Sequence, residues 1–192
     1  MKPIETSVKE WLTLADACRD AEEPSDQLNA VLAVAFNAFD FRIRDNGSWA
    51  IFDPAQTGLR YAMVCRTEPQ EGGAAVARAD MTRCLAGLLS LQPYTASIDA
   101  TRLAIRKMLP GWAIRVGECH LSDDAWLCPD WNDPAHGARL RAEYGEPVVG
   151  HWTNDGVDID RRPAGHPALA LCEAACRAMA EVVGARRAGD AP

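Results

Sequence analysis

The sequence predicts an α+β protein, a layered sandwich of helices packed on antiparallel β-meanders. Segments with the apolar spacing of helices alternate along the chain with short alternating segments typical of strands. The pair Asn46-Gly47 suits the turn of a β-hairpin between two of these strands. The helix predicted over 165–187 carries a long apolar stripe, which includes Cys172 and Cys176, and such a stripe needs a covering surface.

Two helices are predicted at the start of the chain. Ser7 and Glu10 form a capping box at the first, and Pro24 ends it. Ser25 starts the second helix, and we expect the two to pack together as a helical hairpin.

Strands and helices then alternate to the end of the chain. The elements predicted in the first half are strands over 41–44, 49–52 and 59–66 and a helix over 76–88. The elements predicted in the second half are a helix from Ser97 to Pro110-Gly111, strands over 112–118, 124–128, 147–152 and 157–160, a short helix over 135–144, and the terminal helix, in which Glu173 can pair with Arg177.

The order helix, strands, helix therefore occurs twice, in residues 25–90 and again in 97–185. We treat a duplication, with two α-β-β-(β)-α copies, as a hypothesis, because the identity between the halves is poor and the second copy carries an insertion near 130–150. Gln92-Pro93-Tyr94 is the predicted boundary. It separates residues 1–92, with the helical hairpin, a β-meander and a helix, from residues 93–192.

Composition and charge limit the classes of function. The chain has 192 residues and a net charge of −7, and residues 118–160 carry ten acidic and two basic side chains. That segment has a net charge of −8, so direct nucleic-acid binding is disfavoured. No apolar run is long enough for a membrane span or a signal peptide, and seven irregularly spaced cysteines favour reduced, buried thiols. We therefore expect a cytoplasmic protein.

Residues 93–185 resemble a known family. The segments are Pro93-Tyr94-Thr95-Ala96-Ser97-Ile98-Asp99-Ala100, then Leu109-Pro110-Gly111-Trp112, then His166-Pro167-Ala168-Leu169-Ala170-Leu171-Cys172. They resemble the phage ABA sandwich domain of small phage and prophage proteins, although His166 replaces the usual threonine. The resemblance implies an α-β-α layered fold and a phage or prophage origin. It implies no activity.

Metal and catalytic sites are the weaker interpretations of the polar residues. The spacing of Cys119, His120, Cys128 and His136 fits a zinc site poorly, and Asp155-Gly156 with Asp158 and Asp160 matches only part of a calcium loop. A metal-assisted hydrolase would use Asp123, Asp124 or Asp130 with His120 or His151. Turn and cap roles also explain Asp123, Asp124 and Asp133, so we expect no catalytic residues, no metal and no cofactor.

The favoured interpretation is a binding module. Tryptophan and tyrosine are common anchors of protein interfaces, and several lie within the acidic segment. We expect Trp126 to be a core residue and Trp131 to be exposed. The partner would be a host or phage protein with a basic surface, such as a nucleic-acid enzyme that this protein inhibits or modulates. A structural subunit of a phage particle is a further alternative. The residues predicted to bind the partner are Asp123, Asp124, Asp130, Trp131, Asp133 and Tyr144.

Overall fold

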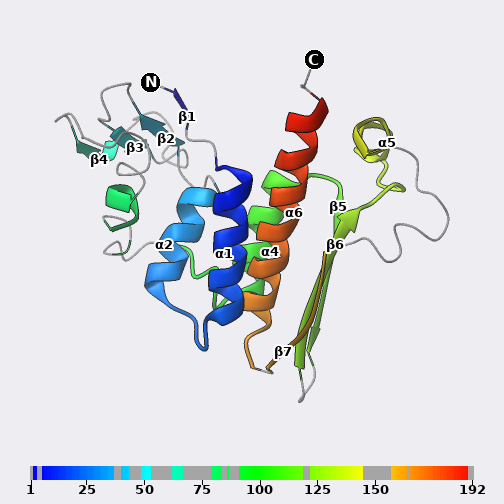
Figure 1. The fold of residues 1–192 in the computed structure, drawn as a ribbon, viewed down its shortest axis with the longest axis horizontal. Helices are drawn as coiled ribbons and strands as arrows, with labels where there is room; N and C mark the ends of the chain where they lie inside the picture. Colours follow the sequence, from blue (N-terminus) through cyan, green and yellow to red (C-terminus); the bar gives the residue numbers. More distant parts are fainter. Residues whose placement is uncertain are drawn as a thin grey trace. The chain divides into compact units, whose positions relative to one another are not determined.

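The protein has a mixed α+β fold in which helices alternate with antiparallel sheets (Figure 1). Its contacts divide the chain into two compact units, one of residues 1–6 and 25–93 and one of residues 7–24 and 94–192. The computed structural model describes residues 2–3, 6–36, 40–43, 49–52, 62–66, 79–83, 86, 91–118, 122–144, 157–163 and 165–189.

The first unit is built on a sheet with the strand order β1-β2-β3-β4. Its described elements are β1 (Lys2–Pro3), α2 (Asp26–Ala35), β2 (Asp40–Ile43), β3 (Trp49–Phe52) and β4 (Ala62–Arg66). Ile43 lies opposite Trp49, which confirms the predicted hairpin, although its turn lies outside the described residues. Residues 79–83 and 86 are helical, within the helix predicted over 76–88. The strand β1 was not predicted, because two residues show no periodicity.

The second unit combines a three-stranded antiparallel sheet, of order β5-β6-β7, with four helices of the described residues. Its elements are α1 (Val8–Asp20), α4 (Ile98–Met108), β5 (Trp112–Glu118), β6 (Ser122–Pro129), α5 (Gly137–Tyr144), β7 (Val157–Pro163) and α6 (Pro167–Gly189). The predicted caps are confirmed at Ser7, whose capping box with Glu10 forms, and at Ser97. The predicted strand over 147–152 lies outside the described residues.

Helix α6 is the centre of the second unit. It contacts α1, α4 and all three strands of the sheet, and Figure 1 shows it between α1 and the sheet. Every residue from Ala168 to Cys176 is therefore buried, which explains why this helix is apolar on most of its surface. The predicted pair of Glu173 and Arg177 forms, and Glu173 is itself buried.

The predicted helical hairpin of α1 and α2 is divided between the two units. Helix α1 belongs with residues 94–192, whereas α2 belongs with the first sheet. The sequence did not predict this division, because an apolar stripe indicates that a helix buries one face but not which element covers that face. Trp11, Leu14, Ala15 and Cys18 are buried on α1, and the residues of α6 supply most of its contacts.

The two units share an order of elements, whereas the duplication itself stays a prediction. In each unit a helix precedes three antiparallel strands, and helical residues follow them. The register also shifts between the last two strands of each sheet, between β3 and β4 at Ile51/Phe52 and between β6 and β7 at Asp123/Ala125. Helices α1, α4 and α6 lie on the same side of the second sheet, and α5 lies apart from them beyond the end of β6 (Figure 1), so the full α-β-α layering stays a prediction.

Candidate functional site

The insertion predicted near 130–150 begins with a turn and helix α5, which pack on the start of β5. We call residues 110–112 and 130–144 the corner. The Asp130 amide donates to the Gly111 carbonyl at 2.8 Å, and the Arg139 guanidinium donates to the Pro110 carbonyl at 2.7 Å. Leu140 is fully buried beneath α5. These contacts fix the backbone of the corner, whose helix α5 lies apart from α1, α4 and α6 (Figure 1).

Gly111 is required by this packing. Its φ is +85°, in the left-handed region that favours glycine. A Cβ at this position would lie 2.4 Å from the Cβ of His136 and 3.0 Å from Cδ1 of Leu140. The predicted helix stop at Pro110-Gly111 is confirmed, and its second role is to let α5 approach the backbone.

Two of the predicted aspartates shape the turn that leads into α5. The Asp130 carboxylate accepts a hydrogen bond from the Asn132 amide at 2.9 Å. The Asp133 carboxylate accepts from the amides of Ala135, at 2.9 Å, and His136, at 2.7 Å. The turn and cap roles considered for such aspartates are thus present at both positions, and both side chains are only half-buried.

Aromatic side chains line the same corner. Trp112 and Tyr144 contact each other edge to face, with ring centroids 5.9 Å apart. Trp131 is half-buried rather than fully exposed, and its carbonyl lies against Gly137, where a Cβ would approach it to 2.4 Å. The exposed residues around them include Asn132, Ala135 and Glu143.

The structure brings together four of the six residues predicted to bind a partner. Asp130, Trp131, Asp133 and Tyr144 belong to the corner, whereas Asp124 lies six residues earlier on β6, about 20 Å away along a strand. The described acids of the corner are Asp130, Asp133 and Glu143, which oppose Arg139 and Arg141. The corner is therefore only slightly acidic, and most of the charge of residues 118–160 lies elsewhere.

Asp123 has a structural role. It is buried, so it is not accessible to a partner as the predicted binding role requires. Its side chain is 2% exposed, and its carboxylate accepts a hydrogen bond from the His166 amide at 2.6 Å. This amide precedes the first turn of α6, where a negative charge is stabilising. The sequence held a signal for this contact: no Ser, Thr, Asp or Asn directly precedes Pro167 to cap α6.

The face of the sheet opposite α6 carries a separate group of side chains. The Arg115 guanidinium lies 5.1 Å from the ring centroid of Trp126, a cation–π contact. The exposed Asp124 lies across Gly117, where a Cβ would clash with its carboxylate. Trp126 was expected in the core but is half-buried here, because β6 turns Ala125 and Leu127 toward α6 instead.

A hollow of about 410 Å³ lies between the first turns of α4 and α6. Ser97, Asp99 and His166 are among its polar lining residues. The Ser97 hydroxyl accepts a hydrogen bond from the Ala100 amide, and the Asp123 carboxylate accepts one from the His166 amide. These backbone donors are thus used by the fold itself.

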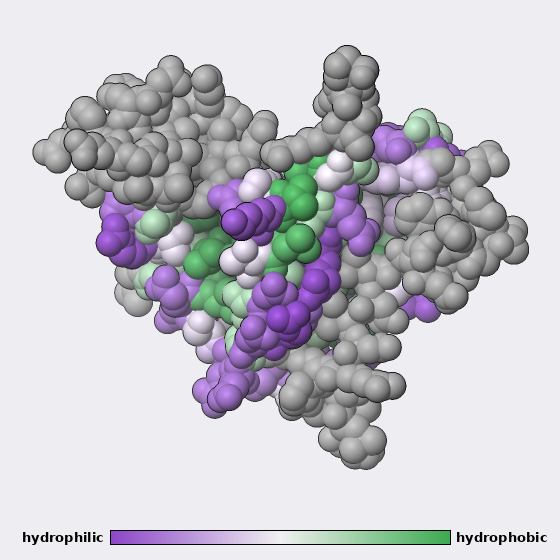
Figure 2. Space-filling model, in the orientation of Figure 1, coloured by the Kyte–Doolittle hydropathy of each residue, from purple (hydrophilic) through white to green (hydrophobic). Residues whose placement is uncertain are grey.

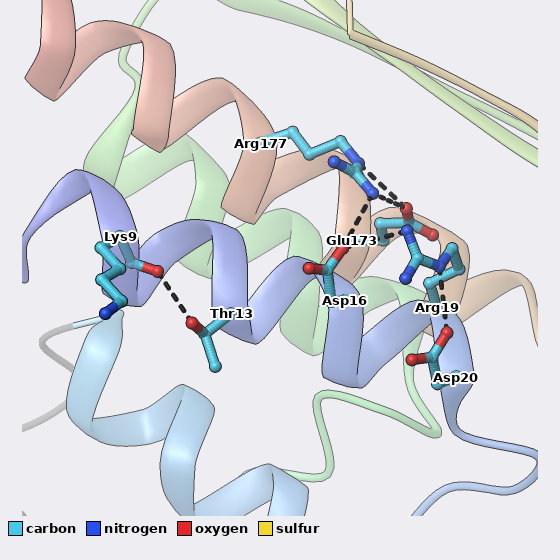
Figure 3. A network of polar contacts seen from close by, with 7 residues as sticks. All are labelled: Lys9, Thr13, Asp16, Arg19, Asp20, Glu173 and Arg177. Atoms are coloured by element: carbon cyan, nitrogen blue, oxygen red, sulfur yellow. Dashed lines mark hydrogen bonds and ion pairs between the residues drawn. The ribbon is translucent and has the colours of Figure 1, made fainter.

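A polar network joins α1 to α6 (Figure 3). Arg177 donates to the buried Glu173 through Nε at 2.9 Å and through Nη2 at 2.7 Å. The same Nη2 lies 3.5 Å from the carboxylate of Asp16, which also pairs with Arg19 at 3.0 Å. Figure 2 shows hydrophilic residues over the lower part of α1, in keeping with this network. The Arg177–Asp16 contact links α1 to α6.

The described residues do not assemble the predicted hydrolase site. Asp123 is buried against α6, Asp124 is on the opposite sheet face, and Asp130 shapes a turn. His120 and His151 lie outside the described residues. In the described part of the chain, no group of three or more His, Cys, Asp or Glu side chains could hold a metal ion. No helix of that part is long and apolar enough to cross a membrane.

Comparison with known proteins gives no match: no family model, curated protein or solved structure is similar to the chain.

Proposed function

We propose that the protein is a binding module, a phage- or prophage-type accessory protein that acts by contacting another protein through its corner. The observation that carries this proposal is the construction of the corner. Residues 130–144 lie outside the packing of α1, α4 and α6, yet hydrogen bonds fix their backbone and present Trp131 and Tyr144 half-exposed. Preorganised aromatic side chains are typical of protein interfaces.

The proposed partner is a protein with basic side chains, because the chain as a whole is acidic although the corner itself is only slightly so. The chain has a net charge of −7, and the acids of the corner, Asp130, Asp133 and Glu143, are each at least partly accessible. Complementary charge raises association rates and orients the encounter, while aromatic contacts supply most of the affinity. A nucleic-acid enzyme of the host fits this description, and inhibition or modulation of it is the proposed activity.

The phage origin rests on the motifs of residues 93–185. The structure gives those motifs physical roles that do not depend on ancestry: Ser97 caps α4, Gly111 admits α5, and residues 167–172 begin the buried α6. The proposed binding activity rests on the corner alone, so it can be tested separately from the origin.

The test is capture of host proteins by the immobilised full chain and by the double variant Asp130→Asn/Trp131→Ala. Asparagine keeps an oxygen that can accept from the Asn132 amide, so the turn persists while the charge is removed. We expect a captured protein to be retained at least about tenfold less by the variant, since interface tryptophans commonly contribute that much. Its retention by the native chain should also fall as salt is raised.

The matched control is Leu12→Ala/Glu22→Gln, which removes one exposed apolar side chain and one exposed carboxylate of the same unit away from the corner. It should capture the same protein as the native chain does. Circular dichroism must show that both variants are folded. Equal loss of capture in the control, or full retention by Asp130→Asn/Trp131→Ala, would place the binding surface elsewhere.

A further inference from the structure

Three cysteines meet where α1 packs on α6. Cys18 of α1 and Cys172 and Cys176 of α6 are each 0% exposed, and α1 lies beside α6 along its length (Figure 1). Cys172 and Cys176 are four residues apart, so they share one face of their helix. Arg177 of α6 lies 3.5 Å from Asp16, two residues before Cys18, so the packing of the two helices places the buried Cys18 beside this face of α6. We call Cys18, Cys172 and Cys176, which are all buried where α1 packs on α6, the cluster.

Neighbouring contacts hold the cluster in register. The Cys172 thiol lies 3.5 Å from the Thr101 hydroxyl and donates to the Tyr94 carbonyl at 3.5 Å. Next to Cys176, Arg177 reaches Asp16, two residues before Cys18 on α1. Cys172 is thus held against residues 94–101, and the Arg177–Asp16 contact links α6 to α1 next to Cys18.

From this geometry we infer that the cluster is a thiol–disulfide site, at which Cys18 forms a disulfide with Cys172 or Cys176 on exposure to a disulfide oxidant such as oxidised glutathione. A Cys18 thiolate attacks the oxidant and releases one glutathione thiol. A thiol of α6, as its thiolate, then displaces the second. Two S–H bonds and the oxidant's S–S bond are broken, one protein S–S bond forms, and the electrons leave in two glutathione thiols.

The position of α1 in the chain gives this bond its consequence. Residues 25–93, which form most of the first unit, separate α1 from the rest of the second unit. A Cys18–Cys172 or Cys18–Cys176 disulfide would close a loop containing that unit and fix α1 on α6. Long loops are the ones whose closure restricts the unfolded chain most. Because all three thiols are buried, the oxidant reaches them only when α1 opens transiently.

The experiment incubates the purified full chain with oxidised glutathione and maps its disulfides by mass spectrometry after alkylation without reduction. The expected product is a monomer with a disulfide from Cys18 to one cysteine of α6, and a melting temperature several degrees above that of the reduced chain. Cys18→Ser should abolish this product, whereas Cys172→Ser and Cys176→Ser should each still form it through the remaining cysteine. The control Cys128→Ser alters a half-buried cysteine on β6 and should behave as the native chain does.

Two results would overturn the inference. One is a folded native chain in which Cys18 stays reduced while the oxidant reacts with other cysteines. The other is a Cys172–Cys176 bond that forms equally well in Cys18→Ser. Should that serine variant fail to fold, the bond map of the native chain alone decides between the outcomes.

Discussion

Replacement of Asp123 by alanine should destabilise the second unit by about 2–4 kcal/mol. The carboxylate is 2% exposed and accepts from the His166 amide at 2.6 Å, and a hydrogen bond to a charged group contributes about 1.5–3 kcal/mol. Its charge near the first turn of α6 adds about 0.3–1 kcal/mol, or more when buried. Asparagine can still accept from this amide, so Asp123→Asn should cost only about 1 kcal/mol.

The neighbouring residue supplies the control. Asp124 carries the same charge on the same strand but is exposed, so Asp124→Ala should change stability by less than about 0.5 kcal/mol. The assay is urea unfolding followed by circular dichroism, with the midpoint compared at unchanged slope. Equal effects of alanine at the two positions would refute the assignment of Asp123 to the fold and return it to the candidate binding residues.

Three further predictions concern buried features of the second unit. Gly111→Ala should cost about 2–4 kcal/mol in urea unfolding, because φ is +85° and His136 occupies the space; Gly184→Ala, with only ordinary contact near its Cβ, should not. Arg177→Met leaves Glu173 buried without its partner and should cost about 2–4 kcal/mol, while Arg177→Met/Glu173→Met should recover part of that loss. Burial raises the pKa of Tyr94 to about 12, with a smaller contribution from Cys172. The stability that Tyr94 contributes should therefore be fully present well below pH 10, its unfolded pKa, and fall by roughly 2–3 kcal/mol as pH rises toward 12. Tyr94→Phe should lack that part of the fall when melting temperatures are compared across this range.

Much of the local structure could be predicted because its signals are local. The capping box at Ser7, the cap at Ser97 and the stop at Gly111 each depend on a few adjacent residues, and the structure shows all three. The strand over 112–118 was predicted at its observed bounds. The burial of α6 was predicted from its apolar stripe, which required a covering surface.

Long-range pairing was beyond these signals. The stripe on α1 predicted burial but not that Cys18 would meet α6 across a whole intervening unit. Asp123 was expected to be accessible because an aspartate seldom is buried, and its partner His166 lies 43 residues away. Trp126 was expected inside because alternation specifies two faces of a strand without saying which one the helices cover.

The candidate binding residues show the same division. Asp130, Trp131 and Asp133 are near neighbours in the sequence, and the structure keeps them together with Tyr144. The net charge of residues 118–160 could not predict how strands distribute it. Arg139 and Arg141 lie on α5, within the corner, and their positive charges offset much of its negative charge.

A photo-crosslinking amino acid introduced in cells in place of Ala135 tests whether the corner contacts a protein. Ala135 is exposed at the corner, and Ala17, exposed on α1, is the matched position away from it. We expect a discrete crosslinked product with another protein from position 135 and none from position 17. Adducts of equal yield at both positions, or an adduct at position 17 alone, would contradict it.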